Sequence, residues 1–248
     1  MKLVFPNAKE LKNIVASTVA FLSEATFTAK ENGLHLLAMD PSNVAIINIE
    51  LNQNCFLEYE ANNDKFTISL EDLKKILSKA KAKDTVTFEL EDSKLVVTLK
   101  GKTTKKFKLP IIDTSEESQL NELPKLDLPI TAELDAKAFK EIIESAKVIA
   151  DDVKLLANPE GPTLSIIAEG EMKEMRIDLT PQDEIVLSLE IPQKALAYYG
   201  VDYLHKLTKV STISDTLVLK FDSNKPVYLE HKLADRLRYV FLLAPREV

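Results

Sequence analysis

The chain is poor in the residues that most often carry covalent or metal chemistry. Its 248 residues include no tryptophan, one cysteine and three histidines. The single cysteine, Cys55, excludes an internal disulfide bond and a cysteine-rich zinc site, and we expect it to be a minor packing or surface residue. The histidines at 35, 205 and 231 are far apart and form no H-x-x-x-H pair, so we expect no metal site.

Glycine is also scarce, which excludes the usual phosphate-binding loops. The five glycines lie far apart, and no G-x-S-x-G nucleophile motif is present. Asp40 is the best single candidate for a catalytic carboxylate because it directly follows a predicted strand. Since Asp-Pro favours turn initiation, we interpret Asp40 as a turn residue ahead of Pro41. We therefore expect a protein without enzyme activity or cofactor, and a carboxylate enzyme such as a nuclease stays an alternative without a motif.

No apolar run approaches the 18 residues that a membrane span requires. The first seven residues also lack the apolar stretch of a signal peptide, so we expect a cytoplasmic protein. The length leaves room for one large domain or for two of about 120 residues each. Hydrophobic residues make up 45% of the chain, which is enough for a core in each of two domains.

An internal repeat at an offset of 128 residues favours two domains. Residues 8–15 (AKELKNIV) line up with residues 136–143 (AKAFKEII). The apolar positions 11, 14, 15 and 18 fall on 139, 142, 143 and 146, and the lysines at 9 and 12 fall on those at 137 and 140. A repeat that keeps both features indicates two copies of one unit, each with a basic face turned the same way.

Hydrophobic periodicity predicts four helices and many short strands. The helices are expected at 9–22, 71–81, 135–147 and 202–210. The strands are expected at 25–29, 34–39, 44–51, 66–70, 85–90, 94–99, 103–111, 153–157, 163–168, 172–179, 185–190, 195–199, 216–221, 227–233 and 237–244, with another near 130. This order predicts an α+β fold with helices on one face of antiparallel sheets. An acidic connector at 113–128, which is followed by Pro129, separates the predicted domains 1–112 and 129–248.

Charge is divided unevenly between the predicted helices and the rest of the chain. The segments 8–22, 71–83, 135–147 and 202–210 hold twelve lysines and seven acidic residues, a net charge of +5. The remainder must carry −12 to give the net charge of −7. Such a split favours weak, sequence-independent and salt-sensitive binding of DNA phosphates at the helices. The plain alternative is that lysine is a good helix former and is common on exposed helices.

Four segments resemble the proliferating cell nuclear antigen family, the sliding clamps of archaea and eukaryotes. Residues 37–46 (LAMDPSNVAI) resemble that family's AMDPS-V segment, and residues 242–246 (LLAPR) resemble its LAP(K/R) ending. Residues 203–209 (YLHKLTK) are similar to its YL…TK helix, and residues 224–232 (NKPVYLEHK) to its PL…EYK strand. The resemblance implies a ring of three two-domain subunits that encircles duplex DNA, with helices lining the hole and sheets outside.

The resemblance also implies which residues meet DNA. Lys12, Lys75 and Lys209 match family lysines on the inner helices, and the repeat adds Lys9, Lys79, Lys137 and Lys140. Glu141 and Glu144 stand where some relatives carry arginine, so the inner face is expected to be less basic than usual.

Members of this family bind client enzymes through a short motif that forms a one-turn helix in an apolar pocket under the connector. The implied clients are DNA polymerase, the clamp loader, flap endonuclease and DNA ligase, in replication and repair. The matching pocket positions are Met39, Val44, Ile46, Leu123, Pro226, Leu242, Ala244 and Pro245. Without the resemblance, each of these would be read as a core residue near a strand end.

Subunits of the family join through edge strands, which ring closure would cover. The candidates are Lys105, Lys106, Phe107 and Lys108 in the first domain and Met175, Ile177 and Leu179 in the second. The lysines facing Glu171 and Glu174 of a neighbour would give an electrostatic match. Three functional alternatives stay open: a self-sufficient homotrimer, one subunit of a heterotrimeric clamp, and a peptide-binding adaptor that does not encircle DNA.

Overall fold

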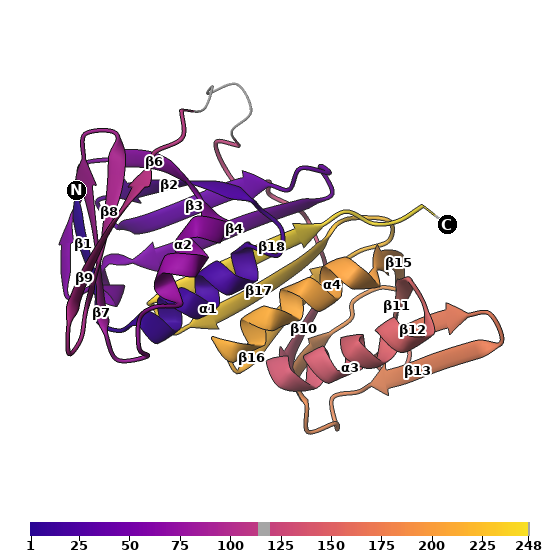
Figure 1. Ribbon diagram of the computed structural model, residues 1–248. Coiled ribbons are helices and arrows are strands. Elements are labelled where there is room, and N and C mark those ends of the chain that lie inside the picture. Colours follow the sequence, from indigo (N-terminus) through magenta and orange to yellow (C-terminus); the bar gives the residue numbers. More distant parts are fainter. Residues whose placement is uncertain (114–119, 248) are drawn as a thin grey trace. The chain divides into compact units, whose positions relative to one another are not determined.

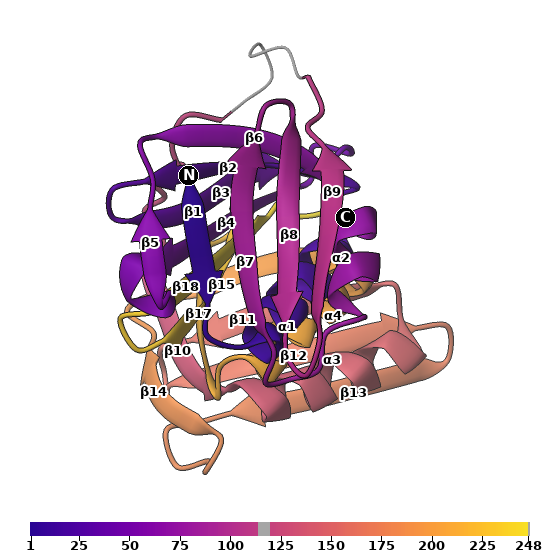
Figure 2. The ribbon, with the colours of Figure 1, turned by 60° about the vertical axis from the view of Figure 1, so that its left-hand side comes forward.

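The computed structural model describes residues 1–113 and 120–247, and the chain divides into two compact units. The first comprises Met1–Asn43, Ile47–Leu123 and Leu233–Tyr239. The second comprises Val44–Ile46, Pro124–Lys232 and the chain from Val240 onward. Figure 1 labels most of the elements of both, and Figure 2 adds labels for β5 and β14.

The first unit contains two helices and two antiparallel sheets. Its elements are β1 (Lys2–Phe5), α1 (Ala8–Thr18), β2 (Glu24–Lys30), β3 (Gly33–Met39), β4 (Ala45–Asn52), the 3-10 helix η1 (Gln53–Cys55), β5 (Glu58–Glu60), β6 (Asp64–Ser69), α2 (Leu70–Leu77), β7 (Thr85–Glu91), β8 (Lys94–Lys100) and β9 (Thr104–Pro110). One sheet has the order β5-β1-β7-β8-β9, and the other runs β4-β3-β2-β6. Figure 2 shows the first of these sheets with β9 along one edge.

The second unit has the same kind of architecture. Its elements are β10 (Ile130–Asp135), α3 (Ala136–Ile149), β11 (Asp152–Asn158), β12 (Thr163–Gly170), β13 (Lys173–Leu179), β14 (Val186–Glu190), β15 (Ala195–Gly200), α4 (Val201–Leu207), the 3-10 helix η3 (Thr208–Thr212), β16 (Thr216–Phe221) and β17 (Val227–Leu233). The last strand is β18 (Leu237–Leu243), and the strands β4, β17 and β18 each supply residues to both units. One sheet runs β13-β12-β11-β15 and the other β14-β10-β16-β17.

The order of elements confirms the repeat. A strand, a helix and three further strands follow one another four times, opened by β1, β6, β10 and β15. Each half adds one strand, β5 or β14, which pairs at the edge with the strand that opens that half. Helix α1 begins at Ala8 and helix α3 at Ala136, so the 128-residue offset holds in the structure.

Side chains at equivalent positions in the two copies are buried or exposed in the same way. The four apolar-stripe positions of α1 and their four partners in α3 are all buried: Leu11, Ile14, Val15, Thr18, Phe139, Ile142, Ile143 and Ala146. Lys9 and Lys137 are both exposed, whereas Lys12 and Lys140 are both half-buried. The repeat therefore preserves a buried apolar stripe and an outward lysine side of each helix.

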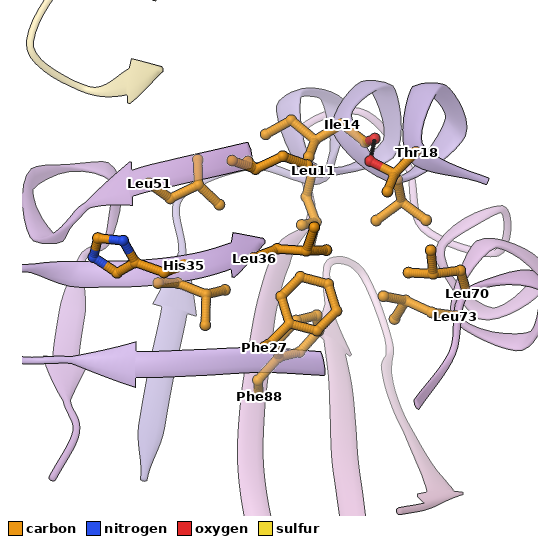
Figure 3. A pocket seen from close by; sticks show the side chains of 13 residues that line it. Leu11, Ile14, Thr18, Phe27, His35, Leu36, Leu51, Leu70, Leu73 and Phe88 are labelled. Atoms are coloured by element: carbon orange, nitrogen blue, oxygen red, sulfur yellow. Dashed lines mark hydrogen bonds between the residues drawn. The ribbon is translucent and has the colours of Figure 1, made fainter. Parts of the chain in front are cut away.

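The core of the first unit joins its helices to both of its sheets. In Figure 3, Leu11 and Ile14 of α1 and Leu70 and Leu73 of α2 meet aromatic and aliphatic side chains from the strands. The strand side chains are Phe27, Leu36, Leu51 and Phe88. This packing turns one side of each helix inward and leaves its lysine-bearing side outward.

Three helices end earlier in the chain than predicted. Helix α1 ends at Thr18 rather than residue 22, α2 ends at Leu77 rather than 81, and α4 ends at Leu207 before the 3-10 turn of η3. In α1 the hydroxyls of Ser17 and Thr18 both donate to the Ile14 carbonyl, at 2.8 and 2.7 Å, as side chains that close a last turn do. The apolar pattern continues past these ends because Leu22 and Ala80 are buried in the turns that follow.

The sequence analysis also missed two strands. Lys2–Phe5 forms β1, which pairs with β7 on one side and with β5 on the other. The second missed strand is β5. Strand β1 has four residues and β5 has three, which is too few for an alternating apolar pattern to be recognised.

Candidate nucleic-acid and partner interfaces

Helices α1 and α2 contact each other in the first unit and carry three of the predicted DNA-facing lysines, and a fourth, Lys79, follows the end of α2. Asn7 caps α1 by accepting from the Glu10 N–H at 3.2 Å, and Ser69 caps α2 by accepting from the Asp72 N–H at 3.2 Å. The Lys12 ammonium donates to the Ala80 carbonyl just beyond α2. The Lys9 backbone N–H donates to the Ala82 carbonyl at 3.3 Å. These bonds hold the start of α1 against the end of α2.

Lys75 and Lys79 lie on the α2 side of the same surface. The Lys75 ammonium pairs with the Asp72 carboxylate at 3.0 Å, and both groups are exposed. This hydrogen bond lowers the pKa of Asp72 and raises that of Lys75. Lys79 is exposed, and its carbonyl accepts from the Lys105 ammonium at 3.0 Å. The structure thus brings Lys9, Lys12 and Lys79 close to one turn, while Lys75 lies within a local ion pair.

In the second unit the predicted lysines lie on α3 and on η3, which contact each other. Asp135 caps α3 through bonds from the N–H groups of Lys137 and Ala138 at 2.9 and 2.7 Å. The Lys137 ammonium lies 3.1 Å from Asp215, and the Lys140 ammonium lies 3.7 Å from Glu144. Lys209 is exposed in η3.

A second group of charges connects α3 to α4. The Lys147 ammonium contacts Asp202 at 2.8 Å, which lowers the pKa of that carboxyl. The His205 ring lies between Lys147, at 3.5 Å, and Glu144, at 4.0 Å. Partial burial and then the charge of Lys147 lower the pKa of His205, so the ring is mainly neutral at pH 7. No sequence signal marked this group, because Lys147 and His205 are 58 residues apart in the chain.

Two of the predicted client-pocket residues lie in the first unit, along two adjoining hollows. One hollow includes Met39, and the other includes Leu123. Both are also lined by Leu37 and Leu120, which the sequence analysis missed. Met39 is 38% exposed at the end of β3, so part of its side chain is accessible to a ligand. The sequence signal that could have identified Leu37 as a lining residue was its place on the outward-facing side of the predicted strand 34–39.

The other six predicted pocket residues lie in the second unit. The Ala244 N–H donates to the Val44 carbonyl at 2.9 Å, which brings the C-terminal segment to the start of β4. Val44, Ile46, Pro226, Ala244 and Pro245 are half-buried. Leu242 is only 4% exposed, so its side chain offers little surface to a ligand.

The C-terminal segment is fixed by Arg246. Its guanidinium Nε lies 2.9 Å from an Asp152 carboxylate oxygen, and its backbone N–H donates to the Tyr198 carbonyl at 2.8 Å. Together with the Ala244 bond, these contacts place the last predicted pocket residues against the second unit.

The predicted turn role of Asp40 is confirmed. Its carboxylate accepts from the Ser42 N–H at 3.2 Å, and its carbonyl accepts from the Asn43 N–H at 2.9 Å. Asn43 adopts a φ of 56°, in the left-handed region that asparagine tolerates better than most residues. Asp40 therefore shapes the loop between β3 and β4.

Strands β9 and β13 are edge strands, as predicted. On β9, Phe107 is half-buried, whereas Lys105, Lys106 and Lys108 are exposed. The ammonium groups of Lys106 and Lys108 contact Glu91 of the same chain at 3.0 and 2.7 Å. Two of the three lysines thus already have an acidic partner.

On β13 the predicted interface residues point toward the core of the unit. Met175 and Ile177 are half-buried, and Leu179 is 2% exposed. The outward row of β13 is Glu174, Arg176 and Asp178, in which the Arg176 guanidinium contacts the Asp178 carboxylate at 3.0 Å. Side-chain contacts across this edge would therefore come mostly from the polar row.

Residues 1–113 and 120–247 contain no cluster of three or more histidine, cysteine or acidic side chains placed to hold a metal ion. Within the same residues, no helix is long and apolar enough to cross a membrane.

Known proteins similar to this chain are sliding clamps. The family profile described as "Proliferating cell nuclear antigen, N-terminal domain" matches residues 1–118, and the profile of the C-terminal domain matches residues 122–246. The "DNA polymerase sliding clamp" of Nanoarchaeum equitans is 40% identical, covering 99% of both chains. "DNA polymerase sliding clamp 1" of Thermococcus kodakarensis is 36% identical, covering 99% of this chain and 98% of that protein.

Solved structures agree with these matches. The crystal structure of PCNA from Thermococcus kodakaraensis superposes with a TM-score of 0.90 at 30% identity and covers 99% of each chain. A PCNA2–PCNA3 complex from Sulfolobus tokodaii reaches the same TM-score at 27% identity, again over 99% of each chain. With both halves matched in order and nearly the whole length aligned, the chain belongs to the proliferating cell nuclear antigen family.

Proposed function

We propose that this protein is a DNA sliding clamp, a processivity factor that encircles duplex DNA and tethers replication and repair enzymes. The observation that carries the proposal is the match of both halves of the chain to both domains of one clamp family, in order. The domain division 1–112, 113–128 and 129–248 belongs to the same proposal. We propose no catalytic activity of its own, and a place in the cytoplasm with the chromosomal DNA.

The proposed DNA-facing groups are the lysines of the helices. They are Lys9, Lys12, Lys75, Lys79, Lys137, Lys140 and Lys209. Lysine ammonium groups bind phosphates without reading bases, so contact is independent of sequence and weakens with salt. A closed ring tolerates weak contact, because topology rather than affinity prevents its escape.

The proposed ring forms when β9 of one copy pairs with β13 of the next. The observation that supports this is that both strands lie at sheet edges. The unpaired backbone N–H and C=O groups of an edge strand are commonly covered by another chain segment, and pairing between subunits would cover them. A head-to-tail contact closes only if its rotation returns to the first copy, and three copies are proposed here. Lys105 of β9, and Glu171 and Glu174 beside and on β13, supply opposite charges for the match.

Client enzymes are proposed to bind through short peptide motifs. The proposed pocket comprises Met39, Val44, Ile46, Leu123, Pro226, Leu242, Ala244 and Pro245, with Leu37 and Leu120 added from the hollows. Apolar anchors of a one-turn helix would fill it. DNA polymerase, the clamp loader, flap endonuclease and DNA ligase are the proposed clients.

The proposal is tested by native mass and by primer extension. Light scattering of the purified protein should give three times 27.8 kDa, and the protein should lengthen the products of a related archaeal DNA polymerase on primed circular DNA. A protein that never forms an oligomer and never lengthens the products, alone or with sister subunits, would refute it.

One alternative keeps specific support. The similar Sulfolobus tokodaii structure is a complex of PCNA2 with PCNA3, so relatives of this fold exist as different chains in one assembly. A stable monomer that forms a trimer only after sister subunits are added would favour a heterotrimeric clamp.

A further inference from the structure

We infer that the first unit supplies most of the attraction for DNA phosphates, through one cluster of lysines, and that the helices of the second unit supply little. This inference rests on the proposed clamp function and assigns its DNA contact to one half of the chain. The lysine cluster comprises Lys9, Lys12, Lys79, Lys81 and Lys83.

Hydrogen bonds place the cluster around a single turn. The segment after α2 presents its carbonyl groups to three neighbours: Lys105 donates to Lys79, Lys12 donates to Ala80, and the Lys9 N–H donates to Ala82. Lys81 and Lys83 are exposed in the same segment. The ammonium groups of Lys12 and Lys105 are therefore held at this segment, and Lys79, Lys81 and Lys83 lie within it. The carbonyl end of the α2 dipole favours positive charge there.

The cluster is not neutralised by the chain itself. Among the residues that the structure describes, none of the five ammonium groups lies in an ion pair with a carboxylate. Of the nearby acids, Glu10 pairs with Arg236 at 3.0 Å. Asp84 accepts from the Lys81 backbone N–H at 2.8 Å, so its single negative charge offsets only part of the positive charge of the cluster. Like charges held together lower stability, and a polyanion would relieve that repulsion.

The lysines of α3 have the opposite surroundings. Each of them lies in an ion pair: Lys137 with Asp215, Lys140 with Glu144 and Lys147 with Asp202. The helical segments 135–147 and 202–210 together carry a net charge of +1, against +4 for segments 8–22 and 71–83. Exposed ion pairs are individually weak, but the local net charge sets the potential that a phosphate meets.

The test compares two triple variants that change the net charge equally. K9Q/K81Q/K83Q removes three charges from the cluster without touching the predicted subunit edges, and K137Q/K140Q/K147Q removes the three lysines of α3. Binding of a fluorescent 30-base-pair duplex is measured by anisotropy at several salt concentrations. Native mass and melting temperature are measured alongside.

The cluster variant should bind the duplex on the order of tenfold more weakly at low salt, and its plot of log K against log salt should lose about two units of slope. The α3 variant should stay within about twofold of the parent. The charge-conserving variant K9R/K81R/K83R should restore both quantities, which separates charge loss from misfolding.

An equal loss in both triple variants, or a larger one in the α3 variant, would overturn the inference and leave the clamp proposal intact. If the parent protein lengthened polymerase products but showed no salt-dependent binding of the duplex, the inference would also be overturned, while the clamp proposal would stay intact. The inference would also be overturned if the parent protein bound polyglutamate as tightly as it binds the duplex, because the cluster would then be a general anion-binding surface. Failure to oligomerise and to assist polymerase would instead refute the clamp function.

Discussion

The buried imidazole of His231 should make this protein lose stability between neutral and mildly acidic pH. His231 lies on β17 in the second unit and is 6% exposed. Burial lowers its pKa from 6.5 to about 4, although a hydrogen bond with the backbone of Thr216 acts in the opposite direction. Its Nδ1 atom has no hydrogen-bond partner among the described residues.

The sign follows from where the proton binds. Below pH 6.5 the unfolded chain takes up a proton at His231, whereas the folded chain does so only near pH 4. Folding stability therefore falls as pH falls through this window and levels off below it. The difference amounts to about 2 kcal/mol between pH 7 and pH 5 and about 3 kcal/mol by pH 4.

The assay is urea unfolding of the parent and of His231→Gln at a series of pH values, at constant protein concentration. Glutamine can replace the polar contact but does not titrate. Tyrosine fluorescence suits the measurement, because the chain has no tryptophan and four of its six tyrosines lie within 124–232. His35→Gln is the matched control, since His35 is a half-buried histidine of the first unit.

The variant should lose about 2 kcal/mol less than the parent on going from pH 7 to pH 5. The control should stay closer to the parent than the variant does, because burial also lowers the pKa of His35, but not by a large shift. Carboxylates such as Asp222 and Asp183, whose pKa values are lowered in the folded chain, add acid sensitivity to all three proteins at lower pH. If the parent and His231→Gln lose stability in parallel, the buried neutral imidazole is not the cause and the reasoning is wrong.

Three further predictions concern other parts of the molecule. Asp135→Ala removes both capping bonds of α3 and should cost about 1 kcal/mol in urea unfolding; no loss would contradict its capping role. Leu73→Ala empties a fully buried position of α2 and should cost about 3 kcal/mol by the same assay, whereas Leu57→Ala, at an exposed position, should cost little. Glu171→Lys with Glu174→Lys should weaken assembly on the order of tenfold in light scattering, and unchanged assembly would remove that electrostatic match.

The arrangement of elements was largely predictable because periodicity and the repeat are local signals. The strands of Thr216–Phe221 and Val227–Leu233 coincide with the predicted ranges, and the start of α3 follows from its Asp135 cap. Helix ends were less predictable, because buried residues such as Leu22 and Ala80 continue the apolar pattern into turns. Short strands like β5 carry too few residues for a pattern.

The candidate surfaces were predictable as sets but not in their electrostatics. The internal repeat identified Lys137 and Lys140 as equivalents of Lys9 and Lys12. The sequence could not show that Asp215, 78 residues away, would pair with Lys137. Nor could it show that Lys12 would be held by a carbonyl beyond α2. Such pairings depend on tertiary contacts between distant segments, and they decide which lysines keep an unbalanced charge.

The central claim is that the protein encircles DNA, and retention on closed DNA tests it most directly. The protein is loaded onto a nicked circular plasmid with a clamp loader and ATP, and it is then passed through a sizing column at high salt. The account predicts co-elution with the circle and release once a restriction enzyme linearises it. With a known archaeal clamp retained under the same conditions, loss from the circle, or equal retention on circle and linear DNA, would contradict the account.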